Sequence, residues 1–231
     1  MMSENTPPLA YRSRCSVLLF LGLAVAVLAV DLASKYWSFR CVADVPLRLA
    51  VRGDDGQPVI EARDAEGNWM ALPPRIANDP ASAIPRHEGV TVAPSVLDLR
   101  LMINTGAVFG VGQGAQRLFI VISIIAAVVI TIIFMRTGAD KRGMHIALAM
   151  VLGGALGNLY DRALYHGVRD MFHLFPDVQL PFGLSWPGGA RDVYPWIFNV
   201  ADMALVLGVI AVVVLSWYYE RQQLKRRSAR G

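Results

Sequence analysis

The sequence predicts a helical membrane protein with four transmembrane helices and a small β-sheet outside the membrane. Of its 231 residues, 55% are hydrophobic and only 17% are charged, and the mean hydropathy is +0.43. Soluble domains average roughly 45–50% apolar and about 25% charged residues, so an ordinary soluble enzyme and a disordered chain are both excluded. Two cysteines are too few for a disulfide-rich scaffold or a structural zinc cluster.

Four stretches without Asp, Glu, Lys or Arg predict the four helices; they cover residues 15–30, 118–135, 143–160 and 203–219. A membrane-spanning helix needs about 20 mostly apolar residues. The first stretch reaches that length only if it continues to Lys35. It has a second interpretation, a cleavable signal peptide, which would leave three crossings. Buried helices of a soluble core are the alternative for all four, but they would leave little sequence to cover them.

The basic residues predict the orientation of these helices. Lys and Arg lie before the first stretch, in the 136–142 link and in the tail. Because such residues favour the cytoplasmic side, we expect both termini in the cytoplasm. The net charge is +4, but its carriers flank apolar runs, so we expect a membrane partner and no nucleic acid. The predicted parts are the N-terminus with the first helix (1–38), an outer β module (39–96), a catalytic core with three helices and an outer loop at 163–197 (97–220), and a basic tail (221–231).

The outer segment after the first helix predicts a short β meander. Apolar residues alternate with polar or small ones over 47–51, and a second such run follows over 59–63. Turn residues separate these runs at 53–56 and follow the second at 66–68. Residues 73–94 are rich in proline, and we expect them to be irregular.

Polar residues gather at the outer ends of the predicted helices. Asp31 and Lys35 are four residues apart on one helix face, in the favourable order for pairing. Asn158 and Arg162 share a face of the third helix in the same way, and Asp161 lies beside them. Ionisable groups in such places are costly and therefore suggest function. The alternatives are an ion pair that anchors the first helix and a local Asp161–Arg162 pair that closes the third.

Two further carboxylates, Asp170 and Asp202, lie on either side of the last outer loop. If they meet, they hold one proton between them. Such a pair can deprotonate a water molecule and protonate a leaving amine, which is peptide hydrolysis without a covalent intermediate. The four histidines show no metal-ligand spacing, and no nucleotide-binding glycine motif is present. We therefore expect no metal and no cofactor.

Five short motifs, in this order, resemble the lipoprotein signal peptidases (signal peptidase II), aspartyl peptidases of the bacterial inner membrane. They are Asp31-Leu-Ala-Ser-Lys35, Asn104-Thr-Gly-Ala-Val-Phe109, residues 153–162, Arg169-Asp170-Met171 and Phe198-Asn-Val-Ala-Asp202. The resemblance covers about 14–38 and 97–220, but not most of 40–95. It implies cleavage of diacylglyceryl-modified prolipoproteins just before the lipidated cysteine, on the outer side of the membrane. It also implies that the outer β segment is a cradle on the membrane surface.

The resemblance assigns roles to residues one by one. Asp170 and Asp202 would be the catalytic pair, with Asp161 in support. Arg162 would contact the substrate backbone or the polar groups of its lipid. The other residues that would line or support the site are Asn104, Gly106, Asn158, Asn199, Ala201, Asp31 and Lys35. The expected partners are lipid-modified prolipoproteins and membrane lipids, and we expect a monomer.

Three departures from the family pattern bear on these expectations. Arg169 stands where an aliphatic residue is usual, and a cation beside Asp170 would change the proton sharing. Met203 stands where Ser or Thr is common. The segments 40–95 and 172–197 are enlarged, which predicts extra strands in the cradle and a lid over the site. Two other functions stay open: an ion- or proton-coupled transporter, and a non-catalytic homologue that only binds lipoproteins.

Overall fold

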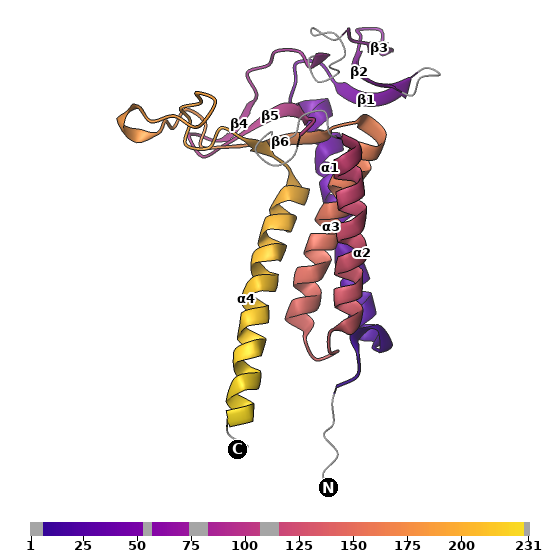
Figure 1. Cartoon of the computed structure of the whole chain (residues 1–231). Helices are drawn as coiled ribbons and strands as arrows, with labels where there is room; N and C mark the ends of the chain where they lie inside the picture. The colour runs from indigo at the N-terminus through magenta and orange to yellow at the C-terminus, as the bar shows by residue number, and fades with distance from the viewer. Residues whose placement is uncertain (1–6, 53–56, 74–82, 107–115, 229–231) are drawn as a thin grey trace. The chain divides into compact units, whose positions relative to one another are not determined.

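The computed structural model describes residues 7–52, 57–73, 83–106 and 116–228 (Figure 1). The chain divides into two compact units. The helical unit comprises Met1–Asp31, Val121–Gly157 and Val200–Gly231, and the sheet unit comprises Leu32–Ile120 and Asn158–Asn199.

Within the described residues, four helices are long and apolar enough to cross a membrane, as the sequence predicts. They are α1 (Arg14–Cys41), α2 (Gln116–Arg136), α3 (Arg142–Tyr165) and α4 (Val200–Ser228). In α3, 67% of the most apolar window is buried, against 22% or less in the other three. The other helices therefore leave apolar side chains exposed, as lipid-facing helices do. The chain is a multi-pass membrane protein, and α1 includes the extension through Asp31 and Lys35.

Glycines on α3 allow close packing in the helical unit. A Cβ atom added at Gly153 would lie 2.6 Å from the carbonyl oxygen of Ala24 on α1. One added at Gly154 would lie 2.5 Å from the carbonyl oxygen of Ala201 on α4. Lipid provides no hydrophobic force between helices, so their association depends on such close approach of small residues.

Three basic segments lie at one end of the helical unit. The N–H of Ala10, in the 3-10 turn η1 (Ala10–Arg12), donates a 2.8 Å hydrogen bond to the carbonyl of Thr137 after α2. The ammonium of Lys141 lies 5.0 Å from the ring centroid of Tyr219, near the end of α4. Segments predicted to share one side of the membrane are thus in contact.

The first sheet of the sheet unit is the predicted meander. Its strands β1 (Leu47–Arg52), β2 (Gln57–Arg63) and β3 (Trp69–Ala71) pair antiparallel in that order. The turn before β3 contains Gly67 at φ +89°, which glycine adopts without strain. The predicted turn at 53–56 lies outside the described residues. The predicted meander is confirmed by these three strands.

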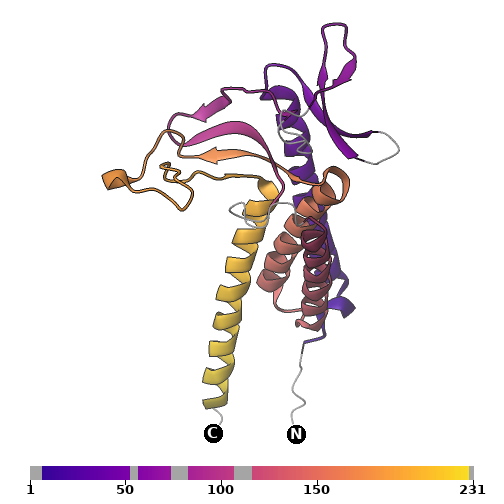
Figure 2. The same cartoon turned by 45° about the horizontal axis from the view of Figure 1, so that its top comes forward.

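A second antiparallel sheet has the order β4-β5-β6-β7 and is seen in Figure 2. Its strands are β4 (Val90–Ala93), β5 (Leu97–Asn104), β6 (Val168–Leu174) and β7 (Ile197–Phe198). The prediction of irregular structure over 73–94 is wrong at β4, because its residues pair with β5. The sequence patterns did not predict β5, β6 or β7, and more than sixty residues separate β6 from its partner β5 along the chain.

The sheet unit buries one apolar core between these sheets and the end of α1. Leu47 and Ile60 from the first sheet share it with Leu101 and Met171 from the second, and Phe39 from α1 joins them. The first four residues of β6, from Val168 to Met171, are all buried. Two charged residues, Arg169 and Asp170, are therefore held inside the protein.

Candidate functional site

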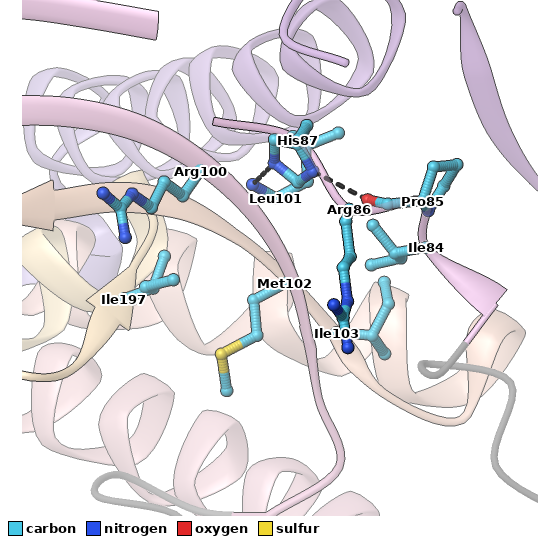
Figure 3. A pocket seen from close by; sticks show the side chains of 9 residues that line it. All are labelled: Ile84, Pro85, Arg86, His87, Arg100, Leu101, Met102, Ile103 and Ile197. Atoms are coloured by element: carbon cyan, nitrogen blue, oxygen red, sulfur yellow. Dashed lines mark hydrogen bonds between the residues drawn. The ribbon is translucent and has the colours of Figure 1, made fainter. Parts of the chain in front are cut away.

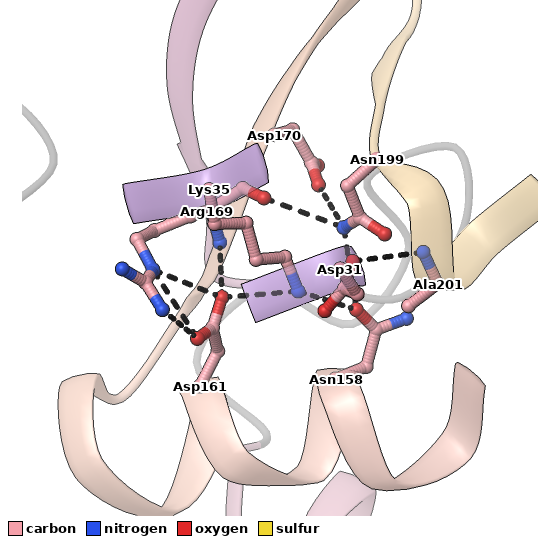
Figure 4. A network of polar contacts seen from close by, with 8 residues as sticks. All are labelled: Asp31, Lys35, Asn158, Asp161, Arg169, Asp170, Asn199 and Ala201. Carbon is pink, nitrogen blue, oxygen red and sulfur yellow. Dashed lines mark hydrogen bonds and ion pairs between the residues drawn. The ribbon is translucent and has the colours of Figure 1, made fainter. Parts of the chain in front are cut away.

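A buried carboxylate, Asp161 near the end of α3, binds two cations in the sheet unit (Figure 4). Its Oδ2 lies 3.2 Å from the ammonium of Lys35. Its Oδ1 accepts a 2.7 Å hydrogen bond from Nη2 of Arg169, whose backbone N–H also donates to Oδ2 at 3.0 Å. All three side chains are at most 8% exposed. Asp161 therefore ties the end of α3 to α1 and to β6.

This geometry corrects two expectations. Among the described residues, the ion pairs of Asp161 are with Lys35 and Arg169, so the alternative of a local pair with Arg162 is wrong. The guanidinium of Arg169 donates to Asp161 at 2.7 Å, so the cation expected to act on Asp170 is paired with another carboxylate. The reason is strand geometry, since neighbouring residues on β6 point to opposite faces.

Asp170 is held by the side-chain amide of Asn199. The Nδ2 of Asn199 donates to Oδ1 of Asp170 at 2.6 Å and to Oδ1 of Asn158 at 3.2 Å (Figure 4). Lys35 also donates to this Asn158 oxygen, at 3.3 Å. Asp170 and Asn199 are fully buried. The network thus links Asp161 to Asp170 through two asparagines and one lysine.

The charges of this network balance. Lys35 and Arg169 supply two cations, and Asp161 and Asp170 supply two carboxylates. Taking a charge out of water is costly unless it is paired and hydrogen-bonded. The two cations and two carboxylates lie in one hydrogen-bonded network, which offsets part of the cost of burying them.

In the helical unit, Asp31 binds the beginning of α4. Its Oδ1 accepts a 2.8 Å hydrogen bond from the backbone N–H of Ala201, the second residue of α4. The first N–H groups of a helix have no partner within the helix, so Asp31 caps α4 from another helix. Gly157 leaves the space for this contact, because a Cβ there would lie 2.5 Å from Oδ2 of Asp31. Asp202 belongs to the same first turn of α4.

Arg162 and Asn104 hold the residues just after β5. Arg162 donates from Nη2 to the carbonyl of Gly106 at 3.3 Å, and its guanidinium lies 5.5 Å from the ring centroid of Phe119. The side chain of Asn104 accepts from the N–H of Gly106 at 3.0 Å. Asn104 is the last residue of β5. The rest of that motif, from residue 107, lies outside the described residues.

The sequence thus named most of the polar residues that the sheet unit brings together: Lys35, Asn158, Asp161, Asp170 and Asn199. It missed the pairing role of Arg169 and the close contact at Gly157. The pairing role of Arg169 could have been found from its position as a charged residue in a buried strand. Small residues at helical spacing on α3 were the signal for the second.

A separate open groove of about 450 Å³ lies in the sheet unit (Figure 3). It is lined by Ile84, Pro85, Arg86, His87, Arg100, Leu101, Met102, Ile103 and Ile197, none of which belongs to the predicted site. Nε2 of His87 accepts from the N–H of Leu101 at 2.9 Å, so its Nδ1 carries the proton and donates to the Pro85 carbonyl. The side chain of His87 thus fastens the 84–87 segment to β5.

Comparison with known proteins decides the family. Residues 76–218 match the family model for signal peptidase (SPase) II. The chain belongs to the signal peptidase II family. This match includes Asn104, Asp170 and Asp202, and it begins after Asp31 and Lys35. Part of the enlarged outer segment, from residue 76, is also matched.

Several lipoprotein signal peptidases are similar to this member of the family. The one from Anoxybacillus flavithermus is 36% identical over 136 residues, which cover 59% of this chain and 73% of its own. That from Pseudomonas syringae pv. tomato is 36% identical over 137 residues, covering 58% and 72%. The one from Latilactobacillus sakei is 38% identical over 124 residues, covering 54% and 72%.

Two solved bacterial membrane enzymes share the fold. The first, determined at 2.3 Å resolution by the in meso method, gives a TM-score of 0.55 at 22% identity and covers 88% of each chain. The second, at 1.9 Å, gives 0.52 at 23% identity, covering 87% of this chain and 91% of the other. Signal peptidase II enzymes are proteases that process prolipoprotein signal peptides in the bacterial inner membrane.

Proposed function

We propose that this chain is an aspartyl endopeptidase that removes signal peptides from diacylglyceryl-modified prolipoproteins, just before the lipidated cysteine. Asp170 and Asp202 would be its catalytic pair. The observation that carries the proposal is the 2.6 Å hydrogen bond between Asn199 and Asp170. This bond holds the carboxylate of Asp170 next to Asn199, which precedes Asp202 by three residues.

Chain connectivity supports the pairing. Asp202 follows Asn199 by three residues. Consecutive Cα atoms are 3.8 Å apart, so three steps span at most about 11 Å. The backbone of Asp202 is therefore never far from the residue that binds Asp170. The bond from Asp31 to Ala201 adds support, because it fixes the turn from which the Asp202 side chain projects.

In the proposed reaction a water molecule lies between the two carboxylates and the scissile carbonyl. One carboxylate accepts a proton as the water oxygen bonds to the carbonyl carbon, forming a tetrahedral intermediate. The other carboxyl group then gives its proton to the leaving amine as the C–N bond breaks. The pair shares one proton at the start and at the end of the cycle, and no enzyme–substrate bond forms.

The residues around the pair would have supporting roles. Asp161, Lys35 and Arg169 would keep β6 and the end of α3 in place, which follows from their buried ion pairs. Arg162 would contact polar groups of the substrate backbone or lipid, since a guanidinium binds carbonyl and phosphate oxygens well. Asn104 and Gly106 would line the same side.

The proposed orientation follows the positive-inside rule. The basic ends of the helical unit would face the cytoplasm, with both termini there, and the catalytic pair would face the periplasm. Lipid chains of the substrate would enter sideways from the bilayer, and the enzyme would work as a monomer.

The test uses the purified full chain in detergent and a diacylglyceryl-modified precursor peptide. We expect cleavage just before the lipidated cysteine, detected by mass spectrometry, and no cleavage of the same peptide without its lipid. A metal chelator leaves the rate unchanged if the two carboxylates activate the water alone. Binding of the intact peptide without turnover would contradict the proposal and favour a non-catalytic homologue. The family match favours hydrolysis over ion-coupled transport.

A further inference from the structure

The segment between β6 and β7, residues 175–196, forms an ordered arm, which we call the aromatic arm. Two backbone hydrogen bonds of 2.7 Å cross it, from Leu180 to Arg191 and from Val193 to Val178. Between them, Gln179 and Asp192 form an antiparallel bridge. The arm is therefore a two-stranded ribbon and not a loose connection.

Aromatic rings fasten the arm to the second sheet. Trp186 packs edge-on against Trp196, with ring centroids 4.7 Å apart, and Tyr194 contacts Trp196 at 5.3 Å. Tyr194 also contacts Phe198 of β7 at 5.9 Å. The indole N–H of Trp186 donates to the carbonyl of Asp192 at 3.0 Å. Edge-to-face ring pairs stabilise such a cluster beyond the area they bury, so the base of the arm is rigid.

The tip of the arm presents apolar side chains to its surroundings. It contains the 3-10 turn η4 (Pro181–Gly183), in which Phe182 is 98% exposed. Phe182 also has φ +60°, a left-handed conformation that is unfavourable for a bulky residue. Leu184 beside it is 58% exposed. Both the strained backbone and the exposed ring of Phe182 are unfavourable, which suggests that this side chain contacts something outside the protein.

The composition of the arm indicates what that contact is. Residues 178–190 contain no Asp, Glu, Lys, Arg or His. Phe and Leu at the tip with Trp nearer the base is the arrangement of segments that enter the boundary between lipid headgroups and acyl chains. Of the nearest charged residues, Asp177 lies at the base of the ribbon, and Arg191 lies opposite Leu180 beside the tip, where its guanidinium would reach the lipid headgroups.

Chain connectivity places the base of the arm beside a membrane. β7 ends at Phe198, and the membrane-spanning α4 begins at Val200. The arm therefore ends only four residues before a transmembrane helix. The surface that the exposed tip contacts is therefore that of the bilayer which α4 crosses.

We propose that the tip of the aromatic arm, Pro181–Leu184, inserts into the interface of this bilayer and anchors the sheet unit to the lipid. The anchor is separate from the proposed catalytic pair and does not depend on peptidase activity. It gives a role to an enlarged segment for which the sequence suggested a lid.

The test places a fluorescent nitrobenzoxadiazole group at position 182 of the full chain. Cys15 and Cys41, both exposed, are first replaced by serine, and Phe182→Cys provides the label site. The labelled protein is reconstituted in vesicles of phosphatidylethanolamine and phosphatidylglycerol whose acyl chains are brominated or not. Bromine quenches only a reporter in contact with the acyl region. A second reporter at Leu184→Cys guards against a local effect, and a control reporter sits at Glu66→Cys, in the exposed turn before β3.

We expect a loss of emission at 182 and 184 in brominated vesicles and no loss at 66. No quenching at the two tip positions would overturn the proposal. It would also be overturned by equal quenching at all three positions, or by a tip reporter shielded from aqueous iodide yet unaffected by bromine, which would indicate a protein partner.

Discussion

The side-chain amide of Asn199 donates a 2.6 Å hydrogen bond to the carboxylate of Asp170, and both residues are fully buried. Hydrogen bonds to charged groups are worth about 1.5–3 kcal/mol. Asn199→Ala should therefore reduce the cleavage rate about 10- to 100-fold, because tenfold corresponds to about 1.4 kcal/mol.

This variant also has a signature that a general loss of packing would lack. Removing a donor to the ionised carboxylate disfavours that form, so the acid limb of the rate–pH profile should move to higher pH. Asn68→Ala, in an exposed turn, is the matched control and should behave as the wild type. An Asn199→Ala profile that coincides with the wild type would count against this role.

Two variants of Asp31 distinguish its role as a hydrogen-bond acceptor that caps α4 from a role of its negative charge. Asp31→Ala removes the acceptor for the Ala201 N–H, which should cost about 0.5–2 kcal/mol of stability and speed hydrogen exchange in the first turn of α4. Asp31→Asn keeps an oxygen acceptor of the same size and should recover most of the loss. Equal damage from both variants, measured by thermal unfolding in detergent, would show that the charge matters instead of the cap.

The buried pair between Arg169 and Asp161 should be essential to stability. Arg169→Gln leaves a buried carboxylate without its bidentate partner, and breaking such a pair typically costs about 3–5 kcal/mol. Arg169→Lys should lose less stability than Arg169→Gln but should stay below the wild type, because an ammonium keeps the charge and cannot make the bidentate contact. Arg63→Gln is the control, since Arg63 is exposed and should change stability by about 0.5 kcal/mol or less. Similar melting temperatures for Arg169→Gln and Arg63→Gln would refute this reading.

The close helix contacts of α3 predict that valine is tolerated less well at Gly154 than at Gly22. A Cβ at Gly154 meets the Ala201 carbonyl at 2.5 Å, whereas one at Gly22 meets nothing within 4 Å. Gly154→Val should destabilise the protein by about 1–3 kcal/mol more than Gly22→Val, since overpacking costs that much while both changes share the same effect on helix propensity. Unfolding in detergent gives the comparison, and equal effects would argue against close packing there.

Local patterns were enough to predict part of this fold. The apolar runs predicted all four helices, because a lipid-spanning helix is specified by its own composition. Alternation between turn residues predicted β1 to β3, where partners are adjacent in the chain.

The second sheet could not be predicted in this way. β5 pairs with β6, so that Met102 lies opposite Asp170, and nearly seventy residues separate them. Strand formation there depends on tertiary context more than on intrinsic preference. At Val90–Ala93 the alternation was present, but the surrounding prolines outweighed it.

At the site, too, the sequence predicted which residues take part but not which residues they contact. The sequence named Asp161, Asp170 and Asn199 as site residues, but their partners depend on which face each side chain takes. Arg169 was expected beside Asp170 because the two are neighbours in sequence. Once β6 is known to be a strand, alternation turns Arg169 toward Asp161 instead.

The central claim is that Asp170 and Asp202 act together on one water molecule. Asp170→Asn and Asp202→Asn should each lower the rate of cleavage of the lipidated precursor by about a thousandfold or more, and the double variant should be no slower than either single one, because groups that act as a unit are not additive. Asp177→Asn is the control, since Asp177 is exposed at φ +65° and asparagine tolerates that backbone. If either single variant keeps near-normal turnover while the protein still inserts, or if the two losses multiply in the double variant, the carboxylate pair is not the catalyst.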